Sequence, residues 1–562
     1  MSDQHKLSFQ KKLSNYLHDR HRGMLLGLLF ATFLVYIPYI NNALFFDDLP
    51  FFSSAVSHYV TLSSVLELRW LSYASLGWTW QLFTDTPLPL HLGNLLLHAA
   101  NTLLVFVLLQ QLMELSLKKD DSHVVRSSFF SSPANWGAWL GALCFACHPV
   151  AVYAVGYIVQ RSTLMATLFI LSMQLTYLRG LINPQKFQQY VHLALAVLFY
   201  FFAVFSKEHS LMAPALLAAI TLLFKPHIRP NWRALIVTWL SFIAIAILIT
   251  LKAKGVFATA YEQDSTALFE QQAIVSSAEN LHLLSMFTQA GLFFKYLFLW
   301  LIPNPAWMSI DMRETFANSV SAWQNWLKVT CFIAYGVFAL KLLLRRGKVG
   351  LIGFALLYPW LLFMIEFSSI RVQEPFVLYR SYLWMPGFML FIPLALQTLP
   401  NKKGVIAAFT FVILLLIPIS WNRLWVFADS YRLWNDAAVL LKSDFVPGAA
   451  RIFYNRGNAE LNTKKTKEAI ADFKRVLAID PKIEQAHANL GSAYLNTGQY
   501  ALGLASVNRA IEINPENGQT YFAKAFALKH LNNPIEAMEA LNKSCELKNI
   551  SACLIIALTQ KK

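Results

Sequence analysis

The sequence predicts an all-α protein in which a bundle of membrane-spanning helices precedes an array of paired helices. The first observation is composition: 56% of the 562 residues are hydrophobic, only 14% are charged, and the mean hydropathy is +0.45. Soluble proteins contain about a quarter charged residues. The second observation is a series of apolar runs between residues 24 and 420 that could cross hydrocarbon as helices. The third is a 34-residue spacing near the C-terminus, between Gly457 and Gly491.

The apolar runs show no alternation of period two, so they are predicted to be helices rather than strands of a membrane barrel. We expect about 11 spans within a domain at 24–420. They are 24–44, 91–112, 134–152, 155–178, 188–205, 209–224, 234–252, 327–344, 349–366, 383–398 and 404–420. A further apolar run, 286–303, would break the alternation of sides, so we expect it to be re-entrant or to lie at the outer interface.

The formal net charge of +16 comes from short basic tracts between the apolar runs, at 6–23, 225–233, 342–348 and 401–403. This distribution is typical of cytoplasmic loops in a polytopic membrane protein, and it argues against a nucleic-acid partner. The first apolar run follows the basic residues 1–23 and lacks a small-residue cleavage site. It therefore predicts an uncleaved anchor with a cytoplasmic N-terminus, which places the residues after 420 on the outer side.

After a linker at 421–449, residues 450–562 show the periodicity of helical repeats. Gly457 and Gly491 are one period apart, as are Pro481 and Pro515. Small residues let two antiparallel helices touch, and a proline ends the second helix of each pair. The pattern resembles about three tetratricopeptide repeats, which form short arrays that bind peptides.

Two adjacent acids in "FFDDLPF", Asp47 and Asp48, follow the first apolar run on the predicted outer side. Asp48 could cap a helix that begins at Leu49, which explains one acid but not the other. A carboxylate near the membrane surface can act as a general base toward an attacking hydroxyl, and a neighbouring acid raises its pKa. We therefore predict Asp47 and Asp48 as the catalytic acids.

Cationic residues recur at the predicted outer turns: Arg161, Lys207 and Arg380, with Tyr379 beside the last. Arginine binds phosphate in a two-pronged fashion, so these residues are candidates for binding the phosphate of a lipid. The alternatives are an ion pair between Lys207 and its neighbour Glu208, and interfacial anchoring of residues 379–380.

The helix predicted at 91–112 carries His91, Asn94, His98 and Asn101 along one stripe. Hydrogen bonds between helices account for His98 and Asn101, whereas His91, at the outer end, is a candidate pocket residue.

His148 is another candidate pocket residue, because a proline after it breaks the helix at the outer surface. "CFACH" (144–148) also matches a haem-attachment pattern, which we disfavour because both thiols lie inside an apolar helix. The five cysteines predict no disulfide framework. No nucleotide-binding or hydrolase motif is found, so a donor substrate should already be activated.

Together these stretches resemble the GT-C class of polytopic glycosyltransferases, above all transmembrane-and-tetratricopeptide-repeat O-mannosyltransferases and bacterial pilin O-glycosyltransferases. The matching stretches, in family order, are "FFDDLPF", "LGNLLLHAANTLLVF", "CHPVAVYAVGYIVQRSTLMATLF", "FSKEHSLMAP", "WMSIDM" and "LYRSYLWMP". The resemblance implies inverting transfer of a sugar from a polyprenyl-phosphate to a protein hydroxyl outside the cytoplasm.

In that class the first-loop acid is the base, which corresponds to Asp47, with Asp48 as its partner or substitute. Arg161, Lys207 and Arg380 correspond to the residues that hold the lipid phosphate. Glu208 and Asp311, the latter at an acid of the family, are further pocket candidates. The acceptor is then a protein such as a pilin, engaged by the repeats. The resemblance also implies a bacterial inner membrane with a periplasmic repeat domain.

Three other functions remain open at this point. A ligase or polymerase of lipid-diphosphate glycans would add a whole oligosaccharide rather than one sugar. A non-enzymatic scaffold would need the repeats but not the acid pair. A transporter would use the polar stripe, although the sequence shows no inverted repeat of broken helices. The acid pair could also hold a divalent cation, but no fuller ligand set is evident, so no metal site is predicted.

Overall fold

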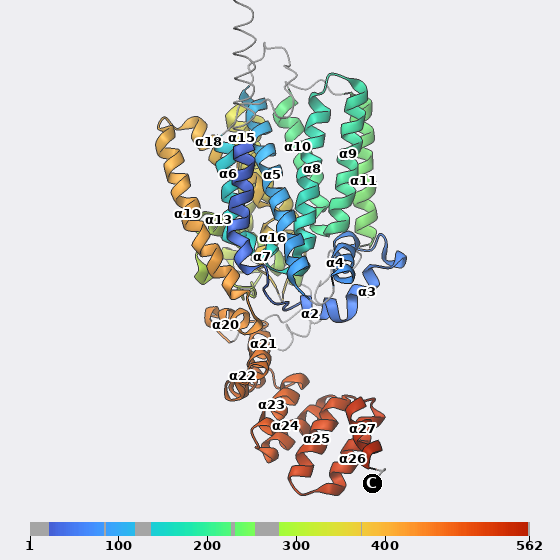
Figure 1. Ribbon diagram of the computed structural model, residues 1–562. Helices are drawn as coiled ribbons and strands as arrows, with labels where there is room; N and C mark the ends of the chain where they lie inside the picture. The colour runs from blue at the N-terminus through green and yellow to red at the C-terminus, as the bar shows by residue number, and fades with distance from the viewer. Residues whose placement is uncertain are drawn as a thin grey trace, which may run out of the picture. The chain divides into compact units, whose positions relative to one another are not determined.

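The computed structural model describes residues 22–83, 86–117, 136–225, 231–252, 280–372, 374–444 and 446–559. These residues form helices and turns without an extended strand, which confirms the predicted all-α class. The chain divides into two compact units (Figure 1). Unit 1 comprises 1–308 and 315–429; unit 2 comprises Ser309–Glu314 and Ser430–Lys562.

Within the described residues, nine helices of unit 1 are long and apolar enough to cross a membrane. They are Arg22–Tyr39, α5 (Leu88–Leu117), α8 (Arg161–Ile182), α9 (Lys186–Ser206), α11 (Trp232–Lys252), α13 (Leu281–Leu301), α14 (Trp323–Leu344), α15 (Gly347–Ser368) and α19 (Lys402–Val426). Two further predicted spans are shorter apolar helices, α10 (Ala213–Phe224) and α18 (Phe391–Thr398). Crossing of a membrane stays a prediction.

A tenth span would consist of α6 (Trp136–Cys147) and α7 (Pro149–Val155), which meet at an angle of 59°. The break has a local cause. Pro149 cannot donate a backbone hydrogen bond, and the ring of His148 instead accepts one from the N–H of Val150, as an N-cap does.

Most of the apolar run at 286–303 lies inside α13, which ends at Leu301 and is held at both ends by contacts within unit 1. Near its start, the hydroxyl of Ser285 donates to the carbonyl of Ser369, just after α15. Near its end, the carbonyl of Trp300 lies 3.1 Å from Nε2 of His148, at the α6–α7 break. The re-entrant or interfacial position of this run stays a prediction, since α13 is also long and apolar enough to cross a membrane.

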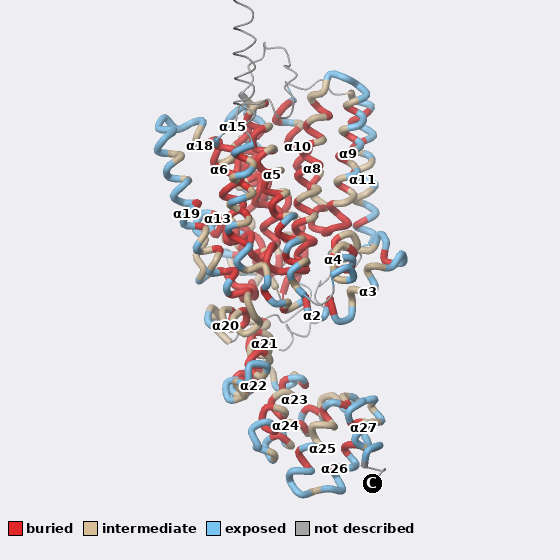
Figure 2. The backbone as a smooth tube through the Cα atoms, in the orientation of Figure 1, coloured by how far each residue is buried: buried red, intermediate tan, exposed pale blue. Residues whose placement is uncertain are grey.

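The interior of unit 1 is buried, and its peripheral helices are exposed along much of their length (Figure 2). Many of the exposed residues are large and apolar. Leu240 of α11 is 60% exposed and Phe411 of α19 is 61% exposed. Large exposed apolar faces are typical of helices in contact with lipid or with another protein. Inside the bundle, glycines permit close helix packing: a Cβ on Gly353 would lie 2.2 Å from the backbone nitrogen of Leu343.

Short elements gather at the lower end of the bundle in Figure 1. After the first helix come α2 (Asp48–Pro50), a π-helical turn η2 (Phe51–Ala55), α3 (Val56–Tyr59) and α4 (Trp70–Leu82). The same end holds η4 (Ile158–Gln160), η5 (Glu208–Met212) and α16 (Leu378–Ser381). These elements carry most of the predicted site residues.

Unit 2 is an array of helix pairs preceded by α20 (Ser430–Leu440). The pairs are α21 (Ala449–Asn462) with α22 (Thr466–Ile479), α23 (Glu484–Asn496) with α24 (Tyr500–Ile513), and α25 (Gly518–His530) with α26 (Pro534–Glu546). As the pattern predicts, a Cβ on Gly457 would lie only 2.9 Å from the ring of Phe473 in the paired helix. Most of the segment predicted as a linker is helical, in the end of α19 and in α20.

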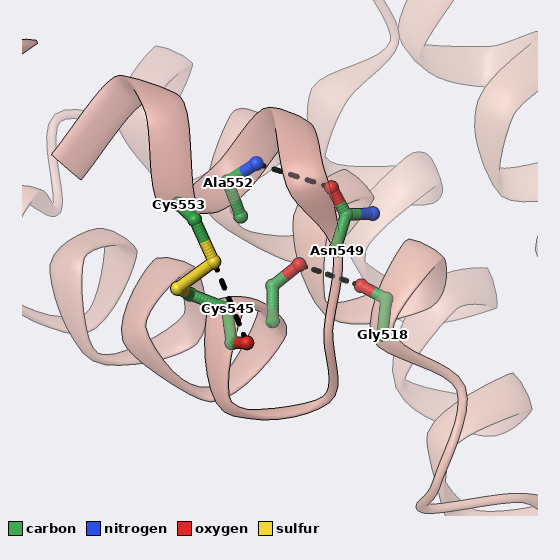
Figure 3. Close-up of a disulfide and its surroundings, with 6 residues drawn as sticks. Gly518, Cys545, Asn549, Ala552 and Cys553 are labelled. Carbon is green, nitrogen blue, oxygen red and sulfur yellow. Dashed lines mark hydrogen bonds between the residues drawn. A yellow bond between two sulfur atoms is a disulfide. The ribbon is translucent and has the colours of Figure 1, made fainter. Parts of the chain in front are cut away.

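A last helix, α27 (Ile550–Thr559), is joined to α26 by a disulfide between Cys545 and Cys553 (Figure 3). The prediction that the cysteines form no disulfide framework is therefore wrong for this pair. Lys548 has a left-handed backbone (φ 65°) in the turn between the helices, which brings the two Cα atoms to 4.8 Å. Cys144 and Cys147 are buried thiols, and Cys331 is an exposed one.

Candidate active site at one end of the bundle

A cavity of about 350 Å³ opens among the short elements of unit 1. Four of the predicted site residues line it: Asp47, Lys207, Tyr379 and Arg380. The rest of the lining is Pro50, Phe51, Ser54, Ala55, Arg69, Tyr73, Val159, Gln160, His209, Arg371 and Glu374. Segments more than three hundred residues apart in the sequence thus meet at one site.

Asp47 is exposed at the cavity and is held by Tyr157. Its backbone N–H donates to the Tyr157 hydroxyl over 3.2 Å, and that hydroxyl is also hydrogen-bonded to the Asp47 carboxylate. Burial, and then the charge of Asp47, raise the pKa of Tyr157, so it stays a protonated donor. Phe46, just before, has a left-handed backbone (φ 54°), which is strained for a bulky residue and typical of functional sites.

Asp48 points away from the cavity into the protein. It is fully buried, and its Oδ1 accepts a hydrogen bond of 2.9 Å from the N–H of Val159 in η4. Burial raises the pKa of Asp48 to about 8. The structure therefore places only one of the two predicted catalytic acids at the cavity. Asp48 does not cap a helix either, because its carboxylate ties the first loop to η4.

Lys207 is a buried ammonium whose hydrogen-bond partners are neutral. Its Nζ donates to Oε1 of Gln160 over 2.9 Å and to Oγ1 of Thr163 over 2.7 Å. It also lies 4.9 Å from the ring centre of Tyr379. Among the residues that the structure describes, no carboxylate oxygen lies within 4.0 Å of this nitrogen. Burial, and then the charge of Arg69, lower the pKa of Lys207 well below its ordinary value.

The alternative pairing of Lys207 with Glu208 is wrong, because Glu208 pairs with Arg69. Nε of Arg69 donates to Oε2 of Glu208 over 2.9 Å, and a second, shorter bond joins the same groups. Glu208 itself does not line the cavity. Arg69 has a left-handed backbone (φ 61°).

Two further cations line the cavity from the chain that follows α15. Nη1 of Arg380 lies 3.1 Å from Oε2 of Glu366, and Nε of Arg371 lies 3.3 Å from the same oxygen. Nε2 of His209 approaches the other oxygen of this carboxylate to 2.6 Å. Glu366 therefore holds both arginines at the cavity wall.

Sequence reasoning missed Arg69 and Arg371. Arg69 stands in the same predicted outer loop as the acid pair. Arg371 comes just before the stretch that contains Arg380. The signal that could have identified both arginines is their closeness in sequence to the predicted motifs.

Arg161, predicted to bind phosphate, does not line the cavity. The residue is 4% exposed, and its guanidinium donates to Oδ1 of Asn94 over 2.9 Å, to the carbonyl of Leu90 and to Oγ1 of Thr79. These bonds join α8 to α5 and α4. The geometry supports a structural role for Arg161 rather than the predicted role in binding phosphate.

The histidines of the polar stripe are also bonded within the bundle. Nε2 of His91 lies 2.9 Å from the carbonyl of Asn42, and Nδ1 of His98 lies 2.7 Å from the hydroxyl of Tyr382. His148 caps α7, as described above. Neither His91 nor His148 lines the cavity, so the structure does not bring these two pocket candidates to the site.

Asp311 lies in unit 2 rather than at the cavity. The described residues contain no group of three or more His, Cys, Asp or Glu side chains suited to a metal ion. A divalent cation shared by the acid pair does not fit this geometry, because Asp47 faces the cavity and Asp48 is bonded to backbone N–H groups.

Comparison with known proteins identifies part of unit 2. The tetratricopeptide repeat family matches residues 450–483, 484–517 and 518–550. Residues 450–550 are three tetratricopeptide repeats. Such repeats typically bind a peptide or protein partner, and the number agrees with the prediction. No curated protein sequence matches the chain.

Among solved structures, the first tetratricopeptide domain of Spaghetti (RPAP3) bound to an HSP90 peptide is 23% identical. The match covers 20% of this chain and 90% of that one, with a TM-score of 0.19. YrrB, a repeat protein with an unusual peptide-binding site, is 16% identical over 30% of this chain and 90% of its own, with a TM-score of 0.22. Similarities at this level carry no argument about the cavity.

Proposed function

We propose that this protein transfers a sugar from a polyprenyl-phosphate donor to a serine or threonine hydroxyl of a protein. Asp47 is the general base, and the cationic wall of the cavity holds the donor phosphate. The proposal rests on one observation above all. The cavity combines an exposed carboxylate with a buried lysine, Lys207, whose Nζ has no carboxylate oxygen within 4.0 Å among the residues that the structure describes.

A buried ammonium without a counter-ion is unfavourable, because the cost of removing it from water is not offset. An anionic ligand at the cavity would offset that cost. The three arginines at the same cavity already have glutamate partners, namely Glu208 for Arg69 and Glu366 for Arg371 and Arg380.

The reaction follows from these roles. Asp47 accepts the proton of the acceptor hydroxyl while the hydroxyl oxygen forms a bond to the anomeric carbon. The bond between that carbon and the phosphate oxygen breaks, and its electron pair stays on the phosphate. Lys207 and Arg380 stabilise the charge that develops there. Tyr157 fixes the orientation of the Asp47 carboxylate.

The tetratricopeptide repeats are the proposed docking site for the acceptor protein, which a pilin would exemplify. The Cys545–Cys553 disulfide supports a location of the repeats outside the cytoplasm, since structural disulfides persist in oxidising compartments. This agrees with the predicted topology, in which the N-terminus is cytoplasmic, the repeats are periplasmic and the membrane is a bacterial inner membrane.

A non-enzymatic membrane scaffold is the second candidate, favoured by the fact that the repeats are the part of the chain with a matched family. A scaffold needs neither Asp47 nor Lys207. Transfer of an intact oligosaccharide from a lipid diphosphate is distinguished by the mass added to the acceptor.

The test is intact-mass spectrometry of envelope proteins from cells that make the wild-type chain or Asp47→Asn. We expect the wild type to add one sugar to an acceptor. Asp47→Asn should lower transfer about a hundredfold or more, since the base is lost while the size of the side chain is kept. Glu67→Gln is the matched control, because Glu67 is an exposed acid of the same loop that bonds His58. Equal glycosylation by wild type and Asp47→Asn would exclude the proposed mechanism.

A further inference from the structure

The segment Ser309–Glu314 lies between α13 and α14 in the sequence, yet it belongs to unit 2. Its neighbours on both sides, Met308 and Thr315, belong to unit 1. The two units are therefore joined not only by the chain after α19 but also by both ends of this short segment.

Asp311 attaches the segment to the first repeat. Its Oδ2 accepts hydrogen bonds from Nη2 of Arg451 over 2.8 Å and from Nε of the same residue over 3.0 Å. Nε of Arg313 lies 2.7 Å from Oδ1. The side chain of Asp311 is 3% exposed and that of Arg313 is 2% exposed. Burial alone would raise the pKa of Asp311, but the two guanidinium groups outweigh it and lower the pKa.

Arg313 makes a second attachment, just before α21. Its Nη1 donates to the carbonyl of Pro447 over 3.1 Å. The next residue, Gly448, has a left-handed backbone (φ 80°), and a Cβ there would lie 2.1 Å from the Arg313 guanidinium. Only glycine satisfies both the conformation and the space, so the start of the first repeat is shaped to hold this arginine.

The residues that flank the segment are fixed inside unit 1. Before it, the carbonyl of Met308 accepts a 2.6 Å hydrogen bond from Arg423, at the end of α19. After it, the N–H of Ala317 donates to Oγ1 of Thr288 in α13 over 2.9 Å. Phe316 packs in one cluster with residues of α13 and with Val372.

The same helix, α13, holds the chain that supplies one wall of the cavity. The hydroxyl of Ser285 accepts from the N–H of Arg371, and the side chain of Gln289 donates to the carbonyl of Pro375. The Tyr296 hydroxyl bonds both backbone groups of Val377. Arg371, Glu374, Tyr379 and Arg380 all come from this chain. A continuous set of contacts thus runs from residues 316–317 through α13 to the cavity.

We propose that Asp311 is a positioning residue, whose bonds to Arg451 make the arrangement of the cavity wall depend on the repeat unit. The inference rests on the proposed function only in taking this cavity as the active site. The competing interpretation is that Asp311 stabilises the start of the first repeat and nothing beyond it.

Hydrogen exchange of the full chain in lipid nanodiscs separates the two interpretations. We expect Asp311→Asn to raise amide exchange about tenfold or more both at 309–317 and at 369–377, with α23–α26 unchanged. Asp444→Asn is the matched control, since it removes a more exposed ion pair of unit 2, with Arg475, and should change neither segment. Faster exchange confined to 309–314 and α21 would overturn the inference.

Arg451→Gln keeps the bond between Asp311 and Arg313 and tests the same connection if Asp311→Asn does not fold. Binding of a short-chain polyprenyl phosphate provides the second measurement. We expect both variants to weaken this binding about tenfold, and unchanged binding would overturn the inference. If the wild type does not bind the lipid, the proposed function fails, and the exchange at 369–377 still decides the inference.

Discussion

The cavity of unit 1 and the repeats of unit 2 treat buried charge differently. In unit 2, Arg456 forms two short hydrogen bonds with Asp472, and Asp311 is bonded by two arginines, although Oε2 of the buried Glu460 has no hydrogen-bond partner among the described residues. At the cavity, Lys207 is buried against neutral groups. A buried charge without a carboxylate or cation beside it is costly, and under the proposed function an anionic ligand would offset that cost for Lys207.

The prediction with the largest expected effect concerns the replacement of Lys207. We expect Lys207→Met to weaken binding of a polyprenyl phosphate about a hundredfold while the protein becomes more resistant to unfolding, because a buried, uncompensated charge is removed. Lipid binding and thermal unfolding of the full chain in nanodiscs measure the two quantities. Loss of stability together with unchanged binding would show that Lys207 is structural.

The lowered pKa of Lys207 adds a pH dependence to the same prediction. Its ammonium loses the proton at a lower pH than an ordinary lysine, whose pKa is about 10.4. Lipid binding should therefore decline as the pH rises toward 10, and Lys207→Arg should remove that decline because arginine stays charged. The stability of the folded state changes with pH in the opposite direction to lipid binding. The folded state binds fewer protons than the unfolded state in the window between the two pKa values, so stability rises with pH there.

The matching change in the repeats should act on stability alone. Asp472→Asn leaves Arg456 without its carboxylate partner, and we expect α21 and α22 to lose about 2 kcal/mol of stability. Hydrogen exchange of these two helices in the full chain measures the loss, with binding of polyprenyl phosphate unchanged. Arg475→Met, at the more exposed pair with Asp444, should cost less than about 1 kcal/mol. A larger loss for Arg475→Met than for Asp472→Asn would contradict the ranking.

The last expected effect concerns the end of the repeat array. Replacing Cys545 and Cys553 together by serine should lower the stability of α26 and α27 by about 2 kcal/mol, since the bridge closes a short loop. Peptide mapping without reduction should first show the linked peptides in protein from a periplasmic location. Free thiols at both positions would contradict the disulfide and remove one support for the predicted side of the membrane.

Much of the fold could be predicted because it depends on periodic patterns. The repeats were found from glycine and proline spacing, and most long helices from apolar runs. The presence of Pro149 predicts a bend between α6 and α7, but the sequence does not predict the angle of that bend. The predicted linker is instead largely helical, because Leu433, Trp434 and Ala437 form a buried apolar face of α20, which packs against the first repeat.

The candidate site was predicted in part. Asp47, Lys207, Tyr379 and Arg380 lie together, while Arg161, His91 and His148 are bonded elsewhere. A sequence shows that a charged residue stands at a helix end, but not which way its side chain turns. Both Arg161 and Lys207 stand at helix ends and are buried, yet the carbonyls of Leu90 and Ser75 surround the first.

The sequence by itself determined that this protein has apolar helices followed by tetratricopeptide repeats, and that its acids and cations stand at the helix ends. These properties depend on composition and on spacing along the chain. Only the tertiary structure decided that Asp47 faces a cavity while Asp48 bonds the backbone, that Arg69 and Arg371 join the site, and that Asp311 belongs with the repeats. The physical reason is that burial and charge compensation are set by groups distant in sequence, which meet only when the helices pack.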